Sequence, residues 1–187
     1  MTGPGDRLHR ATRGPMAGTV DQLDAPFWST PRELVEHMLD LAGVGATDRL
    51  IDLGCGDGRI VIAAARRGAE SLGIDVDPCR IAEAEAGARA AGLENRAHFR
   101  TEDLFETSLD GASVVTLYLV PLTNWLLGYR LQRELVPGSR VVSHAFPIVG
   151  WPADEEHVVE GRHVYLWRVP AEADRPAPAP IPFGTPA

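Results

Sequence analysis

The chain has 187 residues, of which 44% are hydrophobic, and 18 basic residues (all arginine) against 26 acidic ones give a formal net charge of −8. This length is enough to bury the core of one domain. No apolar stretch approaches the ~20 residues of a membrane-spanning helix, and a net acidic chain is a poor candidate for nucleic-acid binding. We therefore expect neither a membrane span nor a nucleic-acid partner.

The cysteines and histidines give no sign of a metal site. Cys55 and Cys79 are too few for a cysteine-ligand pattern, and the six histidines show no metal-ligand spacing. The N-terminus also lacks the apolar segment of a secretory signal peptide. We therefore expect a cytoplasmic protein with reduced thiols and no metal.

The two ends of the chain differ in composition from its middle. Residues 1–26 mix glycine and proline with scattered arginine, and Met16 is a second candidate for the start of the protein. Residues 171–187 carry a proline at nearly every second position around residue 180. Both compositions predict disordered tails. The folded domain is expected to span residues 27–170.

Helical patterns begin directly after the N-terminal tail. Thr30-Pro31 followed by Glu33 predicts a helix start, with Thr30 as the N-cap and Glu33 closing a capping box. The other expected helices occupy residues 59–67, residues 78–91 and a segment that begins near residue 121 and ends before residue 137. The last of these carries four apolar residues on one face, namely Leu122, Trp125, Leu126 and Tyr129.

Apolar runs of strand length alternate with these helices. The expected strands are residues 49–53, 71–76, 97–101, 114–120 and 140–146, and a final pair at 157–160 and 163–169 joined by a turn at Gly161. The alternation predicts an α/β fold with a Rossmann-like, doubly wound sheet. We expect seven strands, mostly parallel, with an antiparallel hairpin at the C-terminal end.

The turn after the first strand carries three glycines in the pattern Asp-x-Gly-x-Gly-x-Gly. A dinucleotide fingerprint fails because Arg59 occupies its third glycine position, and a P-loop is excluded because the chain contains no lysine. The pattern resembles motif I of class I methyltransferases that use S-adenosylmethionine (SAM). A glycine turn without a ligand is the alternative, which the preceding acid makes less favoured. The cofactor-binding candidates here are Asp52, Gly54, Cys55, Gly56 and Gly58.

Acids also follow the second and third strands. Asp75 is expected to accept hydrogen bonds from ribose hydroxyls, whereas its competitor Asp77 suits the N-terminus of the next helix. Asp103 stands where class I methyltransferases hold the adenine amino group through an acid, and Glu102 is the alternative. Ligands of open α/β sheets bind along this edge. The candidates are Asp75, Val76, Asp103 and Leu104.

Further segments narrow the resemblance. Phe-Trp-Ser-Thr-Pro at residues 27–31, Leu-Tyr-Leu-Val-Pro at 117–121 and Phe-Pro at 146–147 occur in order around the glycine motif. Together they resemble the small single-domain protein-lysine N-methyltransferases whose eukaryotic members modify mitochondrial membrane proteins, over about residues 27–169. This chain lacks their membrane-targeting hydrophobic segment, so their substrates are not carried over. The resemblance implies SAM as cofactor and a protein lysine as methyl acceptor.

The rest of the site offers Tyr118 and His144 on the acceptor side, and Trp28 and Thr30 as further cofactor-binding candidates. Tyr118 is the catalytic candidate, because its position resembles motif IV, where an aromatic ring can line the amine channel or contact the amine by a cation–π interaction. A core tyrosine is the alternative. Trp28 is expected to close over the cofactor, with Thr30 beside it, or else to act as a hydrophobic staple. His144 is expected to be a structural histidine rather than a base.

Two other functions stay open from the sequence. A methyltransferase that modifies a nitrogen or oxygen of a small molecule uses the same fold, but it usually needs a larger lid than this short chain offers. A SAM-binding interaction module without catalysis is the second. The acids at three successive strand ends speak against it, because they preserve a complete predicted cofactor site.

Overall fold

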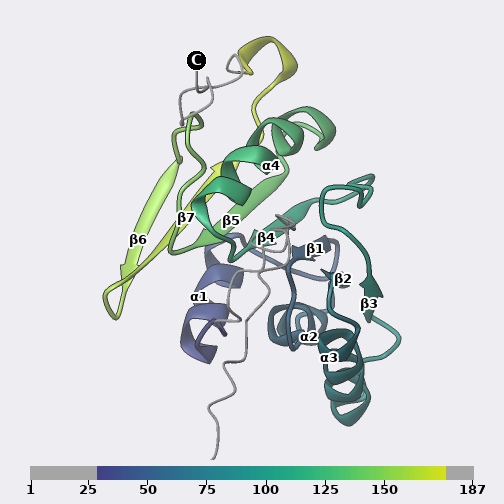
Figure 1. Ribbon diagram of the computed structural model, residues 1–187. Coiled ribbons are helices and arrows are strands. Elements are labelled where there is room, and N and C mark those ends of the chain that lie inside the picture. Colours follow the sequence, from purple (N-terminus) through teal and green to yellow (C-terminus); the bar gives the residue numbers. More distant parts are fainter. Residues whose placement is uncertain (1–28, 176–187) are drawn as a thin grey trace, which may run out of the picture.

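The computed structural model describes residues 29–175 (Figure 1), so Trp28, residues 1–26 and most of residues 171–187 lie outside the described residues. Within that range the chain forms a seven-stranded sheet in the order β3-β2-β1-β4-β5-β7-β6. The strands are β1 (Arg49–Leu53), β2 (Glu70–Asp75), β3 (Ala97–Thr101), β4 (Val114–Leu117), β5 (Arg140–His144), β6 (Glu155–Val159) and β7 (Arg162–Arg168). The helices are α1 (Arg32–Leu41), α2 (Arg59–Arg66), α3 (Pro78–Ala91), α4 (Pro121–Glu134) and the short 3₁₀ helix η1 (Glu172–Asp174).

The topology confirms the predicted fold class. Strands β3, β2, β1, β4 and β5 pair in parallel, and β7 pairs antiparallel with both β5 and β6. The direction of winding reverses between β1 and β4, and ligands of such sheets bind at the carboxyl ends of the strands beside this reversal. No described helix has the length and apolarity that a membrane crossing requires.

Helices cover both faces of the sheet (Figure 1). The face under α1, α2 and α3 buries alternate strand residues such as Leu50, Val114 and Val142. The opposite face is covered by α4 and by the segment around Trp151, which pack on Ile51. Because strand residues alternate between faces, Asp52 lies on the α1–α2 face with Leu50. This alternation determines which side of the sheet the site occupies.

The apolar residues predicted on one face of α4 do not form its core-facing side. Leu126 and Tyr129 are 44% and 47% exposed. The residues buried against the sheet are Asn124, Leu127, Gly128, Leu131 and Gln132. Gly128 belongs to this stripe because a Cβ there would lie 2.4 Å from Cγ2 of Ile148. Because Asn124, Gly128 and Gln132 are not apolar side chains, apolar periodicity does not identify the buried face of α4.

Several strands end earlier than the sequence predicts. β2 and β4 end at Asp75 and Leu117, so Tyr118 lies in the connection beyond β4. β5 ends at His144 because Ala145 adopts a φ of +66°, which takes the chain out of the strand. The parallel strands therefore end in a row, and the segments beyond them form the edge where the predicted site residues lie.

Candidate functional site

The glycine loop between β1 and α2 is held by backbone contacts. The N–H groups of Gly54 and Cys55 both donate to the carbonyl of Ile74 at 2.8 Å. Gly54 and Gly58 have φ values of +82° and +76°, a region that suits residues without a Cβ. A Cβ on Gly54 would also lie 2.7 Å from the Leu119 side chain. The loop conformation therefore requires glycine for both backbone and steric reasons.

Asp75 and Asp77 take different roles beside this loop. The Asp75 carboxylate accepts from the N–H of Gly56 at 2.9 Å and from the N–H of Asp77 at 3.0 Å. Asp77 is the N-cap of α3, and its side chain accepts from the N–H of Cys79 at 2.8 Å. Asp77 thus has the capping role proposed for it, whereas Asp75 joins the end of β2 to the glycine loop.

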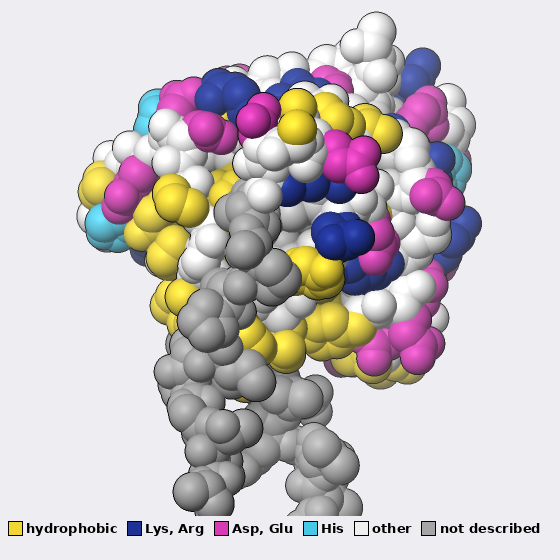
Figure 2. Space-filling view, turned by 90° about the horizontal axis from the view of Figure 1, so that it is seen from above, with side chains coloured by type: hydrophobic (Ala, Val, Ile, Leu, Met, Phe, Trp, Pro, Cys, Tyr) yellow, Lys and Arg dark blue, Asp and Glu magenta, His cyan; other side chains and the backbone are white. Residues whose placement is uncertain are grey.

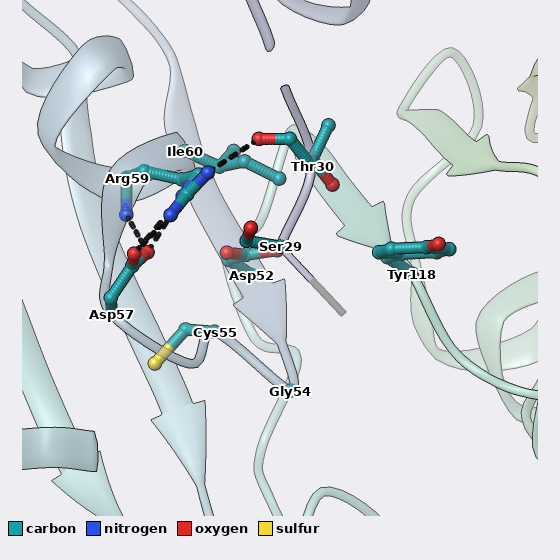
Figure 3. Close-up of a pocket in the computed structure, with 9 residues that line it drawn as sticks. All are labelled: Ser29, Thr30, Asp52, Gly54, Cys55, Asp57, Arg59, Ile60 and Tyr118. Carbon is teal, nitrogen blue, oxygen red and sulfur yellow. Dashed lines mark hydrogen bonds and ion pairs between the residues drawn. The ribbon is translucent and has the colours of Figure 1, made fainter. Parts of the chain in front are cut away.

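A pocket opens between the glycine loop and the end of β4 (Figure 3). It contains five of the predicted site residues together with four that were not predicted. The nine lining residues are Ser29, Thr30, Asp52, Gly54, Cys55, Asp57, Arg59, Ile60 and Tyr118. Three of the five cofactor candidates around the loop, Asp52, Gly54 and Cys55, therefore line the same pocket as Tyr118, whereas Gly56 and Gly58 are not among its lining residues.

The two carboxylates of the pocket differ in their partners. Asp57 is paired with Arg59, whose Nε donates to it at 2.8 Å; burial opposes ionisation, but these contacts hold the pKa of Asp57 below its usual value. Asp52 is buried, and the Thr116 hydroxyl donates to its carboxylate at 2.7 Å. Burial raises the pKa of Asp52 to about 7, and the negative charges of Asp75 and Asp57 add to the effect. Asp52 thus lines the pocket without an ion-pair partner among the described residues.

Thr30 crosses from one side of the pocket to the other. Its carbonyl accepts from Nη1 of Arg59 at 2.8 Å, and its hydroxyl lies 3.2 Å from Nδ1 of His144. The predicted N-cap role of Thr30 is wrong. Pro31 occupies the N-cap position of α1 and no side-chain cap forms, because the Thr30 hydroxyl is directed to His144 instead. Thr30 lines the pocket, and its cofactor-binding role stays a prediction.

Tyr118 and His144 form an aromatic pair at the other end of the pocket. Their ring centroids lie 3.9 Å apart with an interplanar angle of 33°. Burial lowers the pKa of His144 to about 4, and the positive charge of Arg162 contributes, so its imidazole is neutral at pH 7. Burial also raises the pKa of Tyr118. The histidine therefore acts as a neutral, hydrogen-bonded partner, in agreement with the structural role predicted for it.

The remaining predicted cofactor residues lie farther along the same edge. Val76 follows β2 and is 67% exposed, which is unusual for a large apolar side chain. Asp103 follows β3 and is exposed, and its carboxylate accepts from the N–H of Phe105 at 2.8 Å. Leu104 is partly buried against the core. These residues do not line the pocket beside Asp52; their cofactor roles remain predictions.

Four pocket residues were missed by the sequence analysis. They are Ser29, Asp57, Arg59 and Ile60. Arg59 served only as the residue that breaks the dinucleotide fingerprint. The available signal was the pair of opposite charges on either side of Gly58, which points to an ion pair across the helix start. The described residues contain no group of three or more potential metal ligands, and both cysteines are free thiols.

Comparison with known proteins identifies similar chains. The family described as "ANTKMT methyltransferase domain" matches residues 52–155. A protein-lysine N-methyltransferase of Saccharolobus islandicus is 41% identical over 148 residues, which are 76% of this chain and 92% of the relative. The mouse adenine nucleotide translocase lysine N-methyltransferase is 35% identical over 70% of this chain, which spans only 57% of that relative.

Solved structures show the same resemblance. An RNA methyltransferase from Salinibacter ruber, in complex with S-adenosyl-L-homocysteine, has a TM-score of 0.76 and 46% identity, covering 78% of this chain and 95% of the other. TrmN from Thermus thermophilus has a TM-score of 0.62 at 22% identity, covering 74% of this chain and 48% of the other. The second likeness concerns the fold alone.

Proposed function

The chain belongs to the ANTKMT methyltransferase domain family, and we propose that it transfers a methyl group from SAM to the side-chain amine of a lysine in a protein. The chain is a SAM-dependent methyltransferase by this membership. The observation that carries the proposal is one pocket lined by both Asp52 and Tyr118. A cationic cofactor and an amine acceptor would meet in such a hollow.

The pocket residues fit the charges of SAM. Asp52 is a buried carboxylate without an ion-pair partner, and burying an uncompensated charge is costly. The α-ammonium of SAM supplies the missing cation. Arg59, the basic residue of the pocket, is the candidate for the SAM carboxylate, and Asp75 remains the candidate for the ribose hydroxyls. When bound, SAM supplies the electrophilic methyl group.

The chain's own residues must present a neutral amine. A free lysine amine has a pKa of about 10.4, and a desolvated channel lowers it. His144 is a weak base because of its low pKa, so we assign it no proton transfer. The raised pKa of Tyr118 keeps its hydroxyl protonated at neutral pH. Tyr118 therefore offers an aromatic wall and a neutral hydroxyl, which position the amine and exclude water.

A nucleic-acid acceptor is the second candidate, because the Salinibacter ruber neighbour is described as an RNA methyltransferase. Charge favours a protein. RNA binding depends on cationic contacts to phosphates, whereas this chain has a net charge of −8. An acidic enzyme suits a lysine-rich protein better than a polyanion.

The experiment is transfer of radiolabelled methyl groups to three separated pools: cell-lysate proteins, total RNA and small molecules. We expect label in protein that yields methyllysine on hydrolysis. Lysate proteins with chemically acetylated lysines are the control, and they should accept no label. Because this chain contains no lysine, label on the enzyme itself cannot be lysine methylation. Label confined to RNA or to small molecules would overturn the proposal.

A further inference from the structure

Strand β5 connects α4 with the pocket, because its successive residues point to opposite faces of the sheet. Ser143 is fully buried and contacts α4, where Nδ2 of Asn124 donates to its hydroxyl at 3.2 Å. His144, the next residue, contacts Thr30 and Tyr118 at the pocket. Asn124 of α4 thus contacts Ser143, the residue that directly precedes His144 at the acceptor end of the site.

The chain makes an unusual turn directly after His144. The N–H of Phe146 donates to the carbonyl of His144 at 2.8 Å, closing a γ-turn around Ala145. Ala145 has a φ of +66°, although it is not glycine. This conformation is strained for a residue with a Cβ, and it persists only where surrounding contacts hold it. The turn determines where the backbone of His144 lies.

Asn124 supplies those contacts together with Ser143. Its Nδ2 donates to the Phe146 carbonyl at 2.9 Å, and the Ser143 hydroxyl donates to the same oxygen at 2.6 Å. Both donors hold the far end of the γ-turn. Without them the Phe146 carbonyl would lose two hydrogen bonds, and the strain at Ala145 would favour a relaxed turn.

The Oδ1 atom of Asn124 indicates that the side chain acts through its N–H donors. Asn124 is fully buried, and its Oδ1 has no hydrogen-bond partner among the described residues. An apolar residue would avoid the cost of this unpaired oxygen. The useful part of the side chain is therefore its two N–H donors, and both of them are directed to the segment around the turn.

We propose that Asn124 is a positioning residue for methyl transfer, which holds the γ-turn at Ala145 and so keeps His144 against Tyr118 at the acceptor end of the pocket. This inference rests on the proposed function, in which the acceptor amine lies beside Tyr118. It predicts that Asn124 affects the rate of transfer and leaves SAM binding unchanged. Asn124 itself reaches the pocket only through Ser143 and the turn.

Gln132 offers a matched control on the same helix. It is also a buried amide of α4 with an unpartnered oxygen, but its Nε2 donates to the carbonyl of Gly128 within the helix at 3.1 Å. A leucine at either position removes a buried amide from the same face. Any loss of activity caused merely by repacking of α4 would appear in both variants.

The test compares Asn124→Leu, Gln132→Leu, Ala145→Gly and the double variant Asn124→Leu/Ala145→Gly. Initial rates of label transfer to lysate protein are measured at saturating SAM, and SAM affinity is measured by calorimetry. We expect Asn124→Leu to be slower by about tenfold or more with SAM affinity unchanged within about twofold. Gln132→Leu and Ala145→Gly should transfer at nearly the wild-type rate.

The double variant tests the mechanism. Glycine adopts positive φ without strain, so the turn then needs no clamp, and the double variant should recover most of the lost rate. Ser143→Ala, which removes one of the two donors to the Phe146 carbonyl, should reduce the transfer rate several-fold, less than Asn124→Leu does. This variant replaces Asn124→Leu in the test if Asn124→Leu does not fold. A wild-type rate in Asn124→Leu, an equal loss in Gln132→Leu or no recovery in the double variant would overturn the inference. A wild-type enzyme that labels no protein would instead overturn the proposed function.

Discussion

The two halves of the pocket are built in different ways. The cofactor half, which we define as the glycine loop with Asp52 and Asp75, is formed by the carboxyl ends of β1 and β2 and the loop after β1, and backbone N–H groups make many of its contacts. The acceptor half, defined as Thr30, Tyr118 and His144, is assembled from three distant segments, and His144 lies 114 positions after Thr30 in the sequence. A local motif therefore builds the half that we assign to the cofactor, whereas the acceptor half depends on how β4, β5 and the start of α1 pack.

The largest expected effect lies in the cofactor half. Asp52→Asn keeps the acceptor for the Thr116 hydroxyl but removes the charge that pairs with the SAM ammonium. Loss of a buried charge partner should weaken SAM binding on the order of 100-fold, measured by calorimetry at pH 8. The free variant should be more stable than wild type at pH 8 by about 2–4 kcal/mol, because the folded state no longer has to bury an ionised carboxylate. Unchanged SAM affinity in Asp52→Asn would contradict the assignment of Asp52 to the SAM ammonium.

The second effect separates the two acids that follow β2. Asp75→Ala removes the acceptor of two backbone N–H groups and the predicted ribose ligand, so SAM affinity should fall about 10- to 100-fold. Asp77→Ala is the matched control. It removes the α3 cap and should cost about 1 kcal/mol of stability with little change in affinity. An equal loss of affinity in both variants would assign the effect to the helix start instead.

Two buried threonines compare the halves directly. Thr30→Val removes the hydroxyl beside His144 and should slow transfer about fivefold, with SAM affinity unchanged. Thr116→Val removes the hydrogen bond that lowers the pKa of Asp52, so that pKa should rise further and SAM binding at pH 7 should weaken several-fold, recovering at higher pH. Isotope transfer assays and calorimetry on both variants show whether the halves are separable. Equal effects on rate and affinity would contradict the separation.

The same contrast explains what could be predicted from the sequence. The fold class, the presence of the strands and the loop residues around Gly54 and Gly58 follow from periodicity and glycine spacing, because both are local properties, whereas the ends of β2, β4 and β5 did not. Tyr118 was found through a resemblance. Its partner in the acceptor half, His144, was expected to be structural, but its ring contact with Tyr118 requires two strands to end side by side.

Polar residues in apolar surroundings were the hardest to interpret. Asn124 appears in the sequence as an interruption of the α4 pattern, and only the structure shows that its amide reaches Phe146. In the sequence, Arg59 is similarly only a mismatch to the dinucleotide glycine motif. The structure shows that it contacts Asp57 and the Thr30 carbonyl. Hydrogen bonds between distant segments leave no periodic trace, so the sequence carries little signal for them.

The last prediction distinguishes the halves through the pH dependence of stability. The pKa of Asp52 is raised from 3.8 to about 7 by folding, so its contribution to stability is present at low pH and is lost as pH rises from about 4 to 7. The pKa of His144 is lowered from 6.5 to about 4, so its contribution is present above pH 6.5 and is lost as pH falls toward 4.

The two contributions oppose each other between pH 4 and 6.5, and other titrating groups cancel when each variant is compared with wild type. The free energy of unfolding from urea titrations should show Asp52→Asn gaining stability relative to wild type as pH rises through this window, and His144→Gln losing it, each by about 1–3 kcal/mol. The opposite signs of the two stability changes are the test, because they follow from burial of an acid in the cofactor half and of a base in the acceptor half. Parallel trends in both variants would mean that one of the two groups is not buried in the uncharged form.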